Sequence, residues 1–244
     1  MDLHLKGRTY VVTGGTRGLG RAAVDCLLAE GANVVATSRS GAWDGTRPPS
    51  LCVVAADNAD PRAAERLARL AQERFGALHG LLVSVGGPPT ASALEATDEA
   101  WRAAFETIFL GAVRLARTVA AHLPETGVIG LVLSSSVRAP IPNLGLSNGL
   151  RPGLAMLVKE MADQLGPRKI RVVGLVPGRI ATERLNEVDA GDPEARRRSE
   201  ALIPLRRLGE PEEFGRVAAF LLSPAASYIT GACIPVDGGL IRSP

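Results

Sequence analysis

The feature that most constrains the fold is a regular alternation of short apolar runs with longer segments rich in Ala, Leu and Arg. The apolar runs are typical of strands, and they are Thr9–Val12, Asn33–Thr37, Leu51–Ala55, Gly80–Val85, Gly130–Leu133, Arg171–Val176 and Ile234–Val236. The helices expected between them are Gly18–Glu30, Pro61–Phe75, Asp98–His122, Pro152–Leu165 and Pro211–Leu222. Such alternation implies a parallel sheet whose strands are apolar throughout because helices cover both faces. The predicted fold class is therefore α/β, a doubly wound parallel sheet.

The length of the chain predicts one domain, Met1–Pro244. A chain of 244 residues buries ~70–75% of the surface that its unfolded form exposes, so one sizeable core fits and two small domains would be cramped. The longest stretch without an expected strand runs from Gly178 to Ala232, and its first part, Thr182–Leu205, is polar and rich in Arg and Glu. Ligands of this fold class bind beyond the carboxyl ends of the strands, so we expect this insertion to be a substrate lid.

Composition excludes several classes of protein. The three cysteines are far apart and form no CxxC pair, which predicts a reduced, cytoplasmic setting with neither a disulfide framework nor a metal site. No apolar run reaches the ~18 residues of a membrane span, so no membrane partner is expected. The net charge is only +3, and apart from Arg196–Arg198 and the pair Arg206–Arg207 the basic residues are dispersed among acids, so no nucleic-acid partner is expected. The histidines show no ligand spacing and no carboxylate partner in the sequence; they are His4, His79 and His122.

A glycine-rich segment, Thr13–Gly20 (TGGTRGLG), lies between the first expected strand and the first expected helix. Glycine permits a tight turn and a close approach of the backbone to a pyrophosphate, which then sits at the helix N-terminus, where N–H groups and the helix dipole favour negative charge. A Walker-type loop is excluded because Gly20 is followed by Arg21 rather than by Lys. The alternative is an ordinary glycine-rich turn, and the flanking strand and helix favour a dinucleotide site.

The end of the second expected strand indicates which dinucleotide is preferred. An NAD-selective site usually places an acid here on the ribose 2′-hydroxyl, and this chain has Arg39 instead. Together with Arg17, Arg39 offers a guanidinium pair for a 2′-phosphate, which favours NADP(H) and leaves NAD(H) as the alternative. The competing interpretation is that either arginine is simply a solvated loop residue. Asp57 is expected either to hydrogen-bond the adenine amino group or only to cap a turn.

Four separated motifs resemble those of the short-chain dehydrogenase/reductases, in particular their 3-oxoacyl-acyl-carrier-protein-reductase-like branch. The motifs are Thr13–Gly20, Val176–Thr182 (VPGRIAT), Ile203–Glu213 (IPLRRLGEPEE) and Tyr228–Gly231 with Val236–Gly239. The resemblance covers nearly the whole chain, and it implies a Rossmann-type sheet in the order 3-2-1-4-5-6-7, NAD(P)-dependent interconversion of carbonyls and alcohols on a small-molecule substrate, and a homodimer or homotetramer. The cofactor-binding residues that it and the patterns above indicate are Gly14, Thr16, Arg17, Gly18, Leu19, Gly20, Arg39, Asp57, Gly86, Pro177, Gly178, Ile180 and Thr182.

The catalytic set of that family is Asn, Ser, Tyr and Lys, and only the serine matches here. Ile108 stands at the asparagine position, Ser136 matches the serine that polarises the carbonyl, and Ser147 and Arg151 replace the tyrosine and lysine of the YxxxK pair. The family's Asn-Asn-Ala-Gly segment has become Ser84–Gly87. Ser136, Ser147 and Arg151 are therefore the candidate catalytic residues.

The replaced pair changes the proton chemistry. A phenol ionises near pKa ~10 and becomes a usable acid beside Lys⁺, whereas a serine hydroxyl is far less acidic and an arginine stays protonated. Tyr10 and Tyr228 lie in the first strand and in the C-terminal motif, so neither substitutes for the missing tyrosine. Pro152 disfavours helical geometry at Arg151, which predicts that Ser147 and Arg151 do not share a helix face.

Three interpretations remain open. The first, which we favour, is an NADP(H)-dependent oxidoreductase acting on a small or acyl-type substrate, in which Ser136 polarises the carbonyl and the proton comes from water or from the substrate. The second is a nucleotide-binding pseudoenzyme or regulator. The third is non-redox chemistry, in which Arg138, Arg151 and Arg179 bind an anionic substrate.

Overall fold

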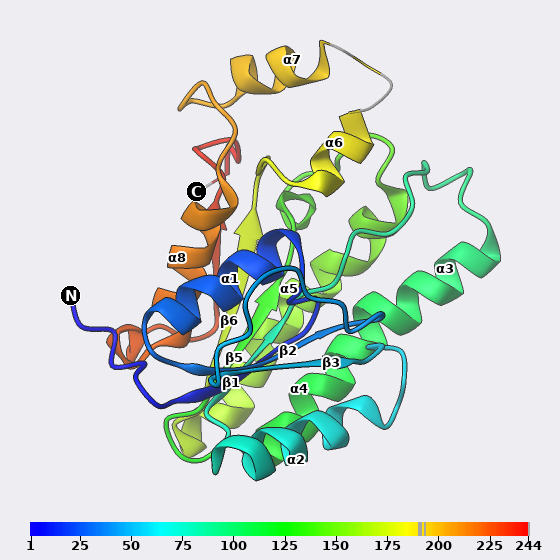
Figure 1. The fold of residues 1–244 in the computed structure, drawn as a ribbon. Helices are drawn as coiled ribbons and strands as arrows, with labels where there is room; N and C mark the ends of the chain where they lie inside the picture. The colour runs from blue at the N-terminus through cyan, green and yellow to red at the C-terminus, as the bar shows by residue number, and fades with distance from the viewer. Residues whose placement is uncertain (190–191, 193, 244) are drawn as a thin grey trace.

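The computed structural model describes residues 1–189, 192 and 194–243 and contains a parallel seven-stranded sheet at its centre (Figure 1). The strand order is β3-β2-β1-β4-β5-β6-β7, as the family resemblance implies. The strands are β1 (Thr9–Val12), β2 (Asn33–Ser38), β3 (Leu51–Ala55), β4 (Gly80–Val83), β5 (Val128–Val132), β6 (Arg171–Pro177) and β7 (Ala232–Val236). Strands β1, β4 and β5 are wholly buried, which explains their unbroken apolar sequences.

Helices cover both faces of the sheet, and each face has its own apolar cluster. Helices α1 (Gly18–Ala29) and α8 (Pro211–Leu222) pack on one face around Tyr10 and Phe214. Helices α2 (Ala63–Phe75), α4 (Gly111–His122) and α5 (Gly145–Leu165) pack on the other. The predicted α/β doubly wound fold is thereby confirmed.

Helix α5 begins earlier than the sequence predicts, and the prediction that Pro152 separates Ser147 from Arg151 is wrong. The helix runs through Pro152 and includes both residues, which are four positions apart and therefore on one face. A proline inside a helix costs ~3 kcal/mol. The burial of Leu146, Leu150 and other apolar side chains of α5, worth ~1.5–3 kcal/mol each, outweighs that cost.

Several other boundaries differ from the predictions. The long helix expected over Asp98–His122 is divided into α3 (Asp98–Ala104), a π-helical segment (Phe105–Leu110) and α4. Strands β5 and β7 each begin two residues early, β5 and β4 end before the predicted Leu133 and Val85, and α2 begins at Ala63, two residues after Pro61. The ends of the strands depend on pairing with neighbouring strands, as in the bond from Val128 N to His79 O, and not on the local apolar pattern.

The order of the strands places a crevice beyond the carboxyl ends of β1 and β4. The chain runs outward from β1 through β2 to β3 and then returns to β4 on the other side of β1, which is the point at which such sheets bind ligands. Two further helices, α6 (Glu183–Asp189) and α7 (Ala195–Leu202), lie above this edge and belong to the predicted lid (Figure 1). Among the described residues, no helix is long and apolar enough to cross a membrane.

Candidate functional site

The glycine-rich segment forms a tight connection from β1 to α1 at the crevice. Gly14 and Gly18 have positive φ angles of 56° and 55°. A Cβ at Gly14 would lie 2.4 Å from Ser84 O, and one at Gly20 would lie 2.2 Å from Gly14 O, so both close approaches require glycine. Arg17 at the N-cap gives α1 no side-chain cap. The N–H groups of the first turn of α1 therefore remain for an anion, which fits the pyrophosphate of a dinucleotide.

The side chains expected at the adenosine end lie at the surface. Arg17 and Arg39 are exposed at the ends of their loops. Asp57 is also exposed, and its Oδ1 accepts a hydrogen bond of 2.9 Å from Ala59 N, so it caps a turn as one of the two alternatives predicted. Its contact with adenine stays a prediction.

A contact that the sequence analysis missed holds the segment after Arg39 against α1. The guanidinium of Arg21 lies 3.6 Å from the ring centroid of Trp43. Arg21 also donates hydrogen bonds of 2.9 Å to Asp25 and of 3.0 Å to Asp44 O. The spacing of more than twenty residues between Arg21 and Trp43 gives no local signal for this pair.

The segment after β4 is bonded directly to the glycine-rich segment. Thr13 Oγ1 donates to Ser84 O at 3.0 Å and accepts from Ser84 N at 3.1 Å. A Cβ at Gly86 would meet nothing within 4 Å, so this backbone borders open space. The two halves of the expected cofactor site are therefore held together, with room beside Gly86.

The Pro-Gly motif after β6 brings the start of the lid to the same place. A Cβ at Gly178 would lie 2.6 Å from Asp237 Cβ, so this glycine permits close packing on the segment after β7. Ile180 is buried and forms an isolated bridge with Gly209. The methyl group of Thr182 lies 3.9 Å from the Cβ position of Gly18, so Thr182 adjoins the glycine-rich segment. Its contact with a cofactor stays a prediction.

The two candidate catalytic serines meet. Ser136 lies in a short 3-10 turn after β5, and Ser147 lies in the first turns of α5. Their Oγ atoms are 3.2 Å apart, and the residues are only 5% and 4% exposed. Ser134 Oγ accepts from Ser136 N at 3.1 Å and so fixes the turn. The arrangement presents two coupled hydroxyl groups beyond the end of β5.

Arg151 is buried and directed at main-chain oxygen atoms. Its Nη1 donates to Val132 O at 2.7 Å and to Leu133 O at 3.1 Å, and its Nη2 donates to Val85 O at 3.4 Å. Burial lowers the pKa of the guanidinium from 12.5 to about 10, so it stays charged at neutral pH.

Neither the residue at the family's asparagine position nor either tyrosine of the chain supplies proton chemistry at this site. Ile108 is 2% exposed and packs in the apolar cluster of α2, α4 and α5. The Tyr10 hydroxyl donates to Leu222 O at 3.2 Å, and burial raises the pKa of Tyr10 to about 12. Tyr228 is fully exposed. Neither tyrosine lies with Ser136 and Ser147.

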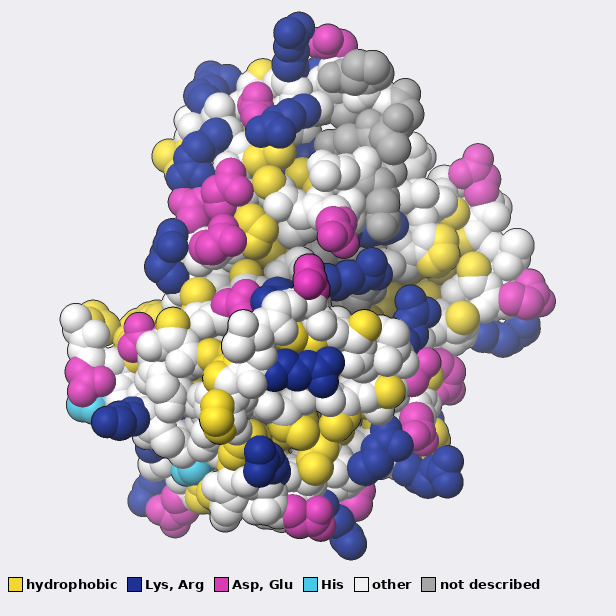
Figure 2. All heavy atoms as spheres, in the orientation of Figure 1, with side chains coloured by type: hydrophobic (Ala, Val, Ile, Leu, Met, Phe, Trp, Pro, Cys, Tyr) yellow, Lys and Arg dark blue, Asp and Glu magenta, His cyan; other side chains and the backbone are white. Residues whose placement is uncertain are grey.

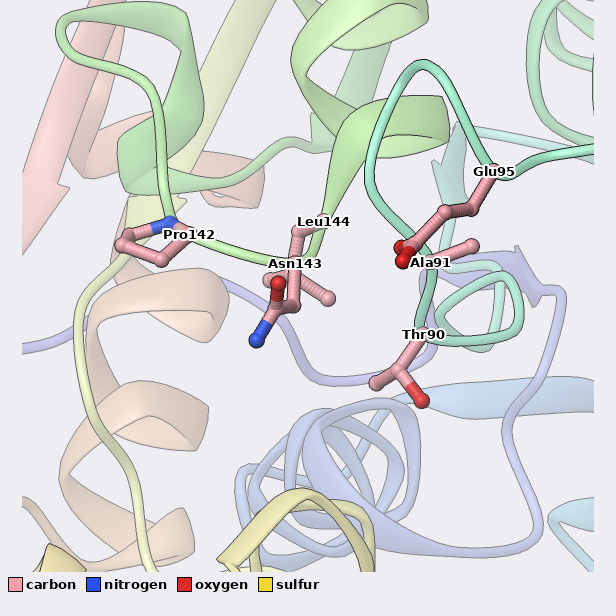
Figure 3. A pocket seen from close by; sticks show the side chains of 6 residues that line it. All are labelled: Thr90, Ala91, Glu95, Pro142, Asn143 and Leu144. Atoms are coloured by element: carbon pink, nitrogen blue, oxygen red, sulfur yellow. The ribbon is translucent and has the colours of Figure 1, made fainter.

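A cavity of about 420 Å³ opens between the segment that follows β4 and the segment that precedes α5 (Figure 3). Its lining residues are Thr90, Ala91, Glu95, Pro142, Asn143 and Leu144. Hydrogen bonds from Ser92 lower the pKa of the Glu95 carboxyl, so Glu95 is ionised at neutral pH. Asn148, the neighbour of Ser147, binds both the N–H and the carbonyl of Ile141 and holds the segment beside the cavity. The cavity offers hydrogen-bond acceptors one helical turn before Ser147.

Arg184 of α6, within the predicted lid, contacts the segment after β4. Its Nη2 donates to Pro88 O at 2.6 Å, and its Nε would lie 3.0 Å from a Cβ at Gly87. The described part of the lid therefore reaches from Thr182, beside the glycine-rich segment, to Pro88.

The other charged residues that the sequence analysis considered lie outside the pair of serines and the cavity, or at the surface. His122 Nε2 lies at hydrogen-bond distance, 2.9 Å, from Glu65 Oε2, a carboxylate partner that the sequence did not reveal. Arg138 is exposed and Arg179 half-buried. Basic and acidic side chains are interspersed over the face in Figure 2, without a stripe of one sign. The run Arg196–Arg198 is exposed on α7 among acidic partners.

Comparisons with known proteins agree with this geometry. A family model described as enoyl-(acyl carrier protein) reductase matches residues 14–241. The chain is 34% identical to L-rhamnose 1-dehydrogenase (NAD(P)(+)) of Azotobacter vinelandii over 96% of each chain, and 34% identical to L-xylulose reductase of Bos taurus over 100% of each. A crystal structure of a glucose/ribitol-type short-chain dehydrogenase/reductase from Brucella melitensis superposes with a TM-score of 0.91, at 29% identity and 100% coverage of both chains. The protein belongs to the short-chain dehydrogenase/reductase family of oxidoreductases.

Proposed function

We propose that the protein is an NADP(H)-dependent oxidoreductase that interconverts a carbonyl and an alcohol on a small, polar substrate. The observation that carries the proposal is the buried pair of hydroxyl groups of Ser136 and Ser147, 3.2 Å apart at the carboxyl end of β5. The glycine-rich segment and the open space beside Gly86 support a dinucleotide at the same edge.

The cofactor is expected to lie along this edge from Arg39 to Gly86. The N–H groups of Gly18, Leu19 and Gly20 hold the pyrophosphate, and Arg39 and Arg17 bind a 2′-phosphate. When bound, the nicotinamide supplies the hydride. NADP(H) is preferred over NAD(H) because the residue directly after β2 is Arg39 and not an acid.

The proton chemistry follows from the two hydroxyl groups. As hydride adds to the substrate carbon, the carbonyl electron pair moves onto oxygen. The Oγ–H of Ser136 donates to that oxygen, and the Oγ–H of Ser147 donates to Ser136 Oγ and strengthens it as a donor. The proton that completes the alcohol comes from water, because a serine hydroxyl is too weak an acid to supply it at neutral pH. Arg151 keeps its proton throughout.

The cavity favours a hydroxylated substrate over an anionic one. Glu95 is an ionised acceptor, Thr90 adds a hydroxyl on the same segment, and Asn143 adds an amide on the facing segment (Figure 3). The names of two relatives, a rhamnose dehydrogenase and a xylulose reductase, agree with a sugar-like compound. An acyl-type substrate is the alternative, and the description of the matching family model, enoyl-(acyl carrier protein) reductase, agrees with it.

The test is the oxidation of NADPH by a panel of sugars, polyols and acyl ketones, followed by absorbance. We expect turnover with hydroxylated ketones or aldoses, and loss of turnover in Ser136→Ala. Glu95→Gln is expected to raise KM for hydroxylated substrates and to spare KM for NADPH. Absence of turnover above the Ser136→Ala control across the panel, in both directions, contradicts the proposal.

A nucleotide-binding regulator is the second candidate, because Ile108, Ser147 and Arg151 stand where the family has its asparagine, tyrosine and lysine. Tight NADPH binding without hydride transfer supports it. Turnover that does not depend on added NADP(H) supports non-redox chemistry with an anionic substrate bound by Arg138 or Arg179.

We further propose a homodimer or homotetramer in the cytoplasm, with Thr182–Leu205 as a substrate lid within a single domain. Light scattering on the purified protein tests the oligomeric state, and localisation of a tagged chain tests the compartment.

A further inference from the structure

Two buried arginines donate hydrogen bonds to main-chain carbonyl groups, one beyond the carboxyl end of β5 and the other at the start of β6. Arg151 binds three carbonyl oxygens beyond the end of β5, and Arg171 binds three at the start of β6, from Leu221, Ser223 and Ile229. Burial lowers the pKa of each to about 10. Neither forms an ion pair with a carboxylate among the residues that the structure describes. The two side chains are thus matched in chemistry and differ in location.

The three oxygens around Arg151 belong to two separate segments. Val132 and Leu133 end β5 and lead within three residues to Ser136, whereas Val85 follows β4 and precedes Gly86. A guanidinium is a planar fork that can donate in several fixed directions at once. Arg151 therefore connects the segment that carries Ser136 with the segment that borders the open space at Gly86.

We propose that Arg151 is a positioning residue, which fixes Ser136 relative to the backbone at Gly86 and does not bind the cofactor. The proposal rests on the proposed function, because it assigns Arg151 a role within that site. This positioning role differs from the role in proton chemistry that the family resemblance implies for the residue at the lysine position. A guanidinium that donates at 2.7 and 3.1 Å to the end of β5 is directed into the protein.

The expected consequence is a loss of geometry and not of cofactor affinity. A misplacement of ~1 Å in a catalytic group costs ~10²-fold in rate. Removing Arg151 frees the turn at Ser136 and the segment at Gly86 to move independently. The turnover number should fall, whereas the affinity for NADPH, set mainly at the glycine-rich segment and Arg39, should change little.

The experiment compares Arg151→Met and Arg151→Lys with the matched control Arg171→Met. Each variant is measured for thermal unfolding, for NADPH Kd by fluorescence titration, and for kcat and KM at a temperature where all are folded. Both Met variants should unfold at lower temperature. Only Arg151→Met should lose kcat, by about 10²-fold, with NADPH Kd near that of the wild type, and Arg151→Lys should recover part of kcat. If Arg151→Met does not fold, Arg151→Lys is compared with Arg171→Met instead, and it should show a loss of kcat smaller than that expected for Arg151→Met.

Two results overturn the inference. The first is a large rise in NADPH Kd with wild-type kcat at saturating NADPH, which makes Arg151 a cofactor ligand. The second is a loss of kcat no greater than that of Arg171→Met, which makes Arg151 merely structural.

Hydrogen exchange separates failure of this inference from failure of the proposed function. Arg151→Lys should speed amide exchange at both Ser134–Val137 and Ser84–Gly87, and Arg171→Met at neither. This readout needs no turnover, so it remains decisive if no substrate is found. Unchanged exchange at the two segments contradicts the positioning role.

Discussion

Ser136 Oγ and Ser147 Oγ lie 3.2 Å apart, although the two residues belong to different elements, the turn after β5 and the helix α5. Both hydroxyl groups are buried, and each has the other as a hydrogen-bond partner. One proton of the pair lies between the two oxygen atoms, and the other can donate to a substrate oxygen, so the two hydroxyl groups act as one hydrogen-bonded unit.

Alanine at either serine is expected to lower kcat. The loss should be about 10²–10³-fold for Ser136→Ala, the range for removing one such donor, and smaller for Ser147→Ala. The double variant should lose less than the product of the two single effects, because the hydroxyl groups act as a unit. Steady-state kinetics measures this, with Ser135→Ala as the neighbouring control that keeps wild-type kcat. Full additivity of the two changes contradicts a shared role.

The cofactor preference is expected to depend on Arg39. A hydrogen bond to a charged group contributes ~1.5–3 kcal/mol, so Arg39→Ala should weaken NADPH binding by roughly 10–100-fold and leave NADH binding nearly unchanged. Arg39→Asp should reverse the preference, because a carboxylate accepts from the ribose 2′-hydroxyl and repels a 2′-phosphate. Fluorescence titration with both dinucleotides measures it. The exposed Arg74→Ala at the end of α2 is the control, and equal losses for NADPH and NADH in Arg39→Ala are the contrary outcome.

The bond from Arg184 to Pro88 O is expected to slow release of the cofactor. Arg184→Ala removes the contact between α6 and the segment after β4, and NADPH should dissociate faster by about tenfold, the equivalent of ~1.4 kcal/mol. Stopped-flow displacement of NADPH measures the rate. Arg196→Ala, on the exposed face of α7, should leave it unchanged. A wild-type dissociation rate in Arg184→Ala would show that this bond does not retain the cofactor.

Stability is expected to fall in mild acid because of His79. Its Nδ1 accepts from Thr9 N at 3.0 Å, which requires a neutral ring at that atom, and burial lowers the pKa of His79 below 6.5. The unfolded chain therefore binds a proton more readily than the folded chain, so the free energy of unfolding decreases as the pH drops below 6.5.

Chemical denaturation at several pH values tests the role of His79. His79→Asn keeps an acceptor near the Nδ1 position and removes the titration, so the slope of stability between pH 7 and the folded pKa should flatten. His4→Gln, at the exposed N-terminal segment, is the control and should keep the wild-type slope. An unchanged slope in His79→Asn contradicts the assignment.

The sequence predicted those parts of the site that lie close together along the chain. Gly14, Gly18 and Gly20 form one segment between a strand and a helix, so their role follows from local backbone geometry. The meeting of Ser136 with Ser147 was foreseeable only through the family resemblance, as was the order of the strands. Apolar periodicity identifies a strand but does not determine its neighbour.

Contacts between distant segments could not be predicted. The bonds from Arg151 to Val85 O and from Arg184 to Pro88 O join residues more than sixty positions apart, and they depend on how the sheet edge is assembled. The start of α5 was mispredicted for the same reason. The local penalty of Pro152 was visible in the sequence, whereas the burial of Leu146 and Leu150 that offsets it depends on the tertiary fold.

The 4% exposure of Ser147 also limits which side chains this position can hold. A tyrosine at this position would need space for a phenol ring where the described structure holds only a hydroxymethyl group against Ser136. Ser147→Tyr would therefore disrupt the packing before it supplied an acid, and Arg151 would still donate to the carbonyl groups of Val132, Leu133 and Val85. A phenol at Ser147 and an ammonium at Arg151 would have to be introduced together with new space for the ring, so no single substitution gives this site the acid–base pair of its family.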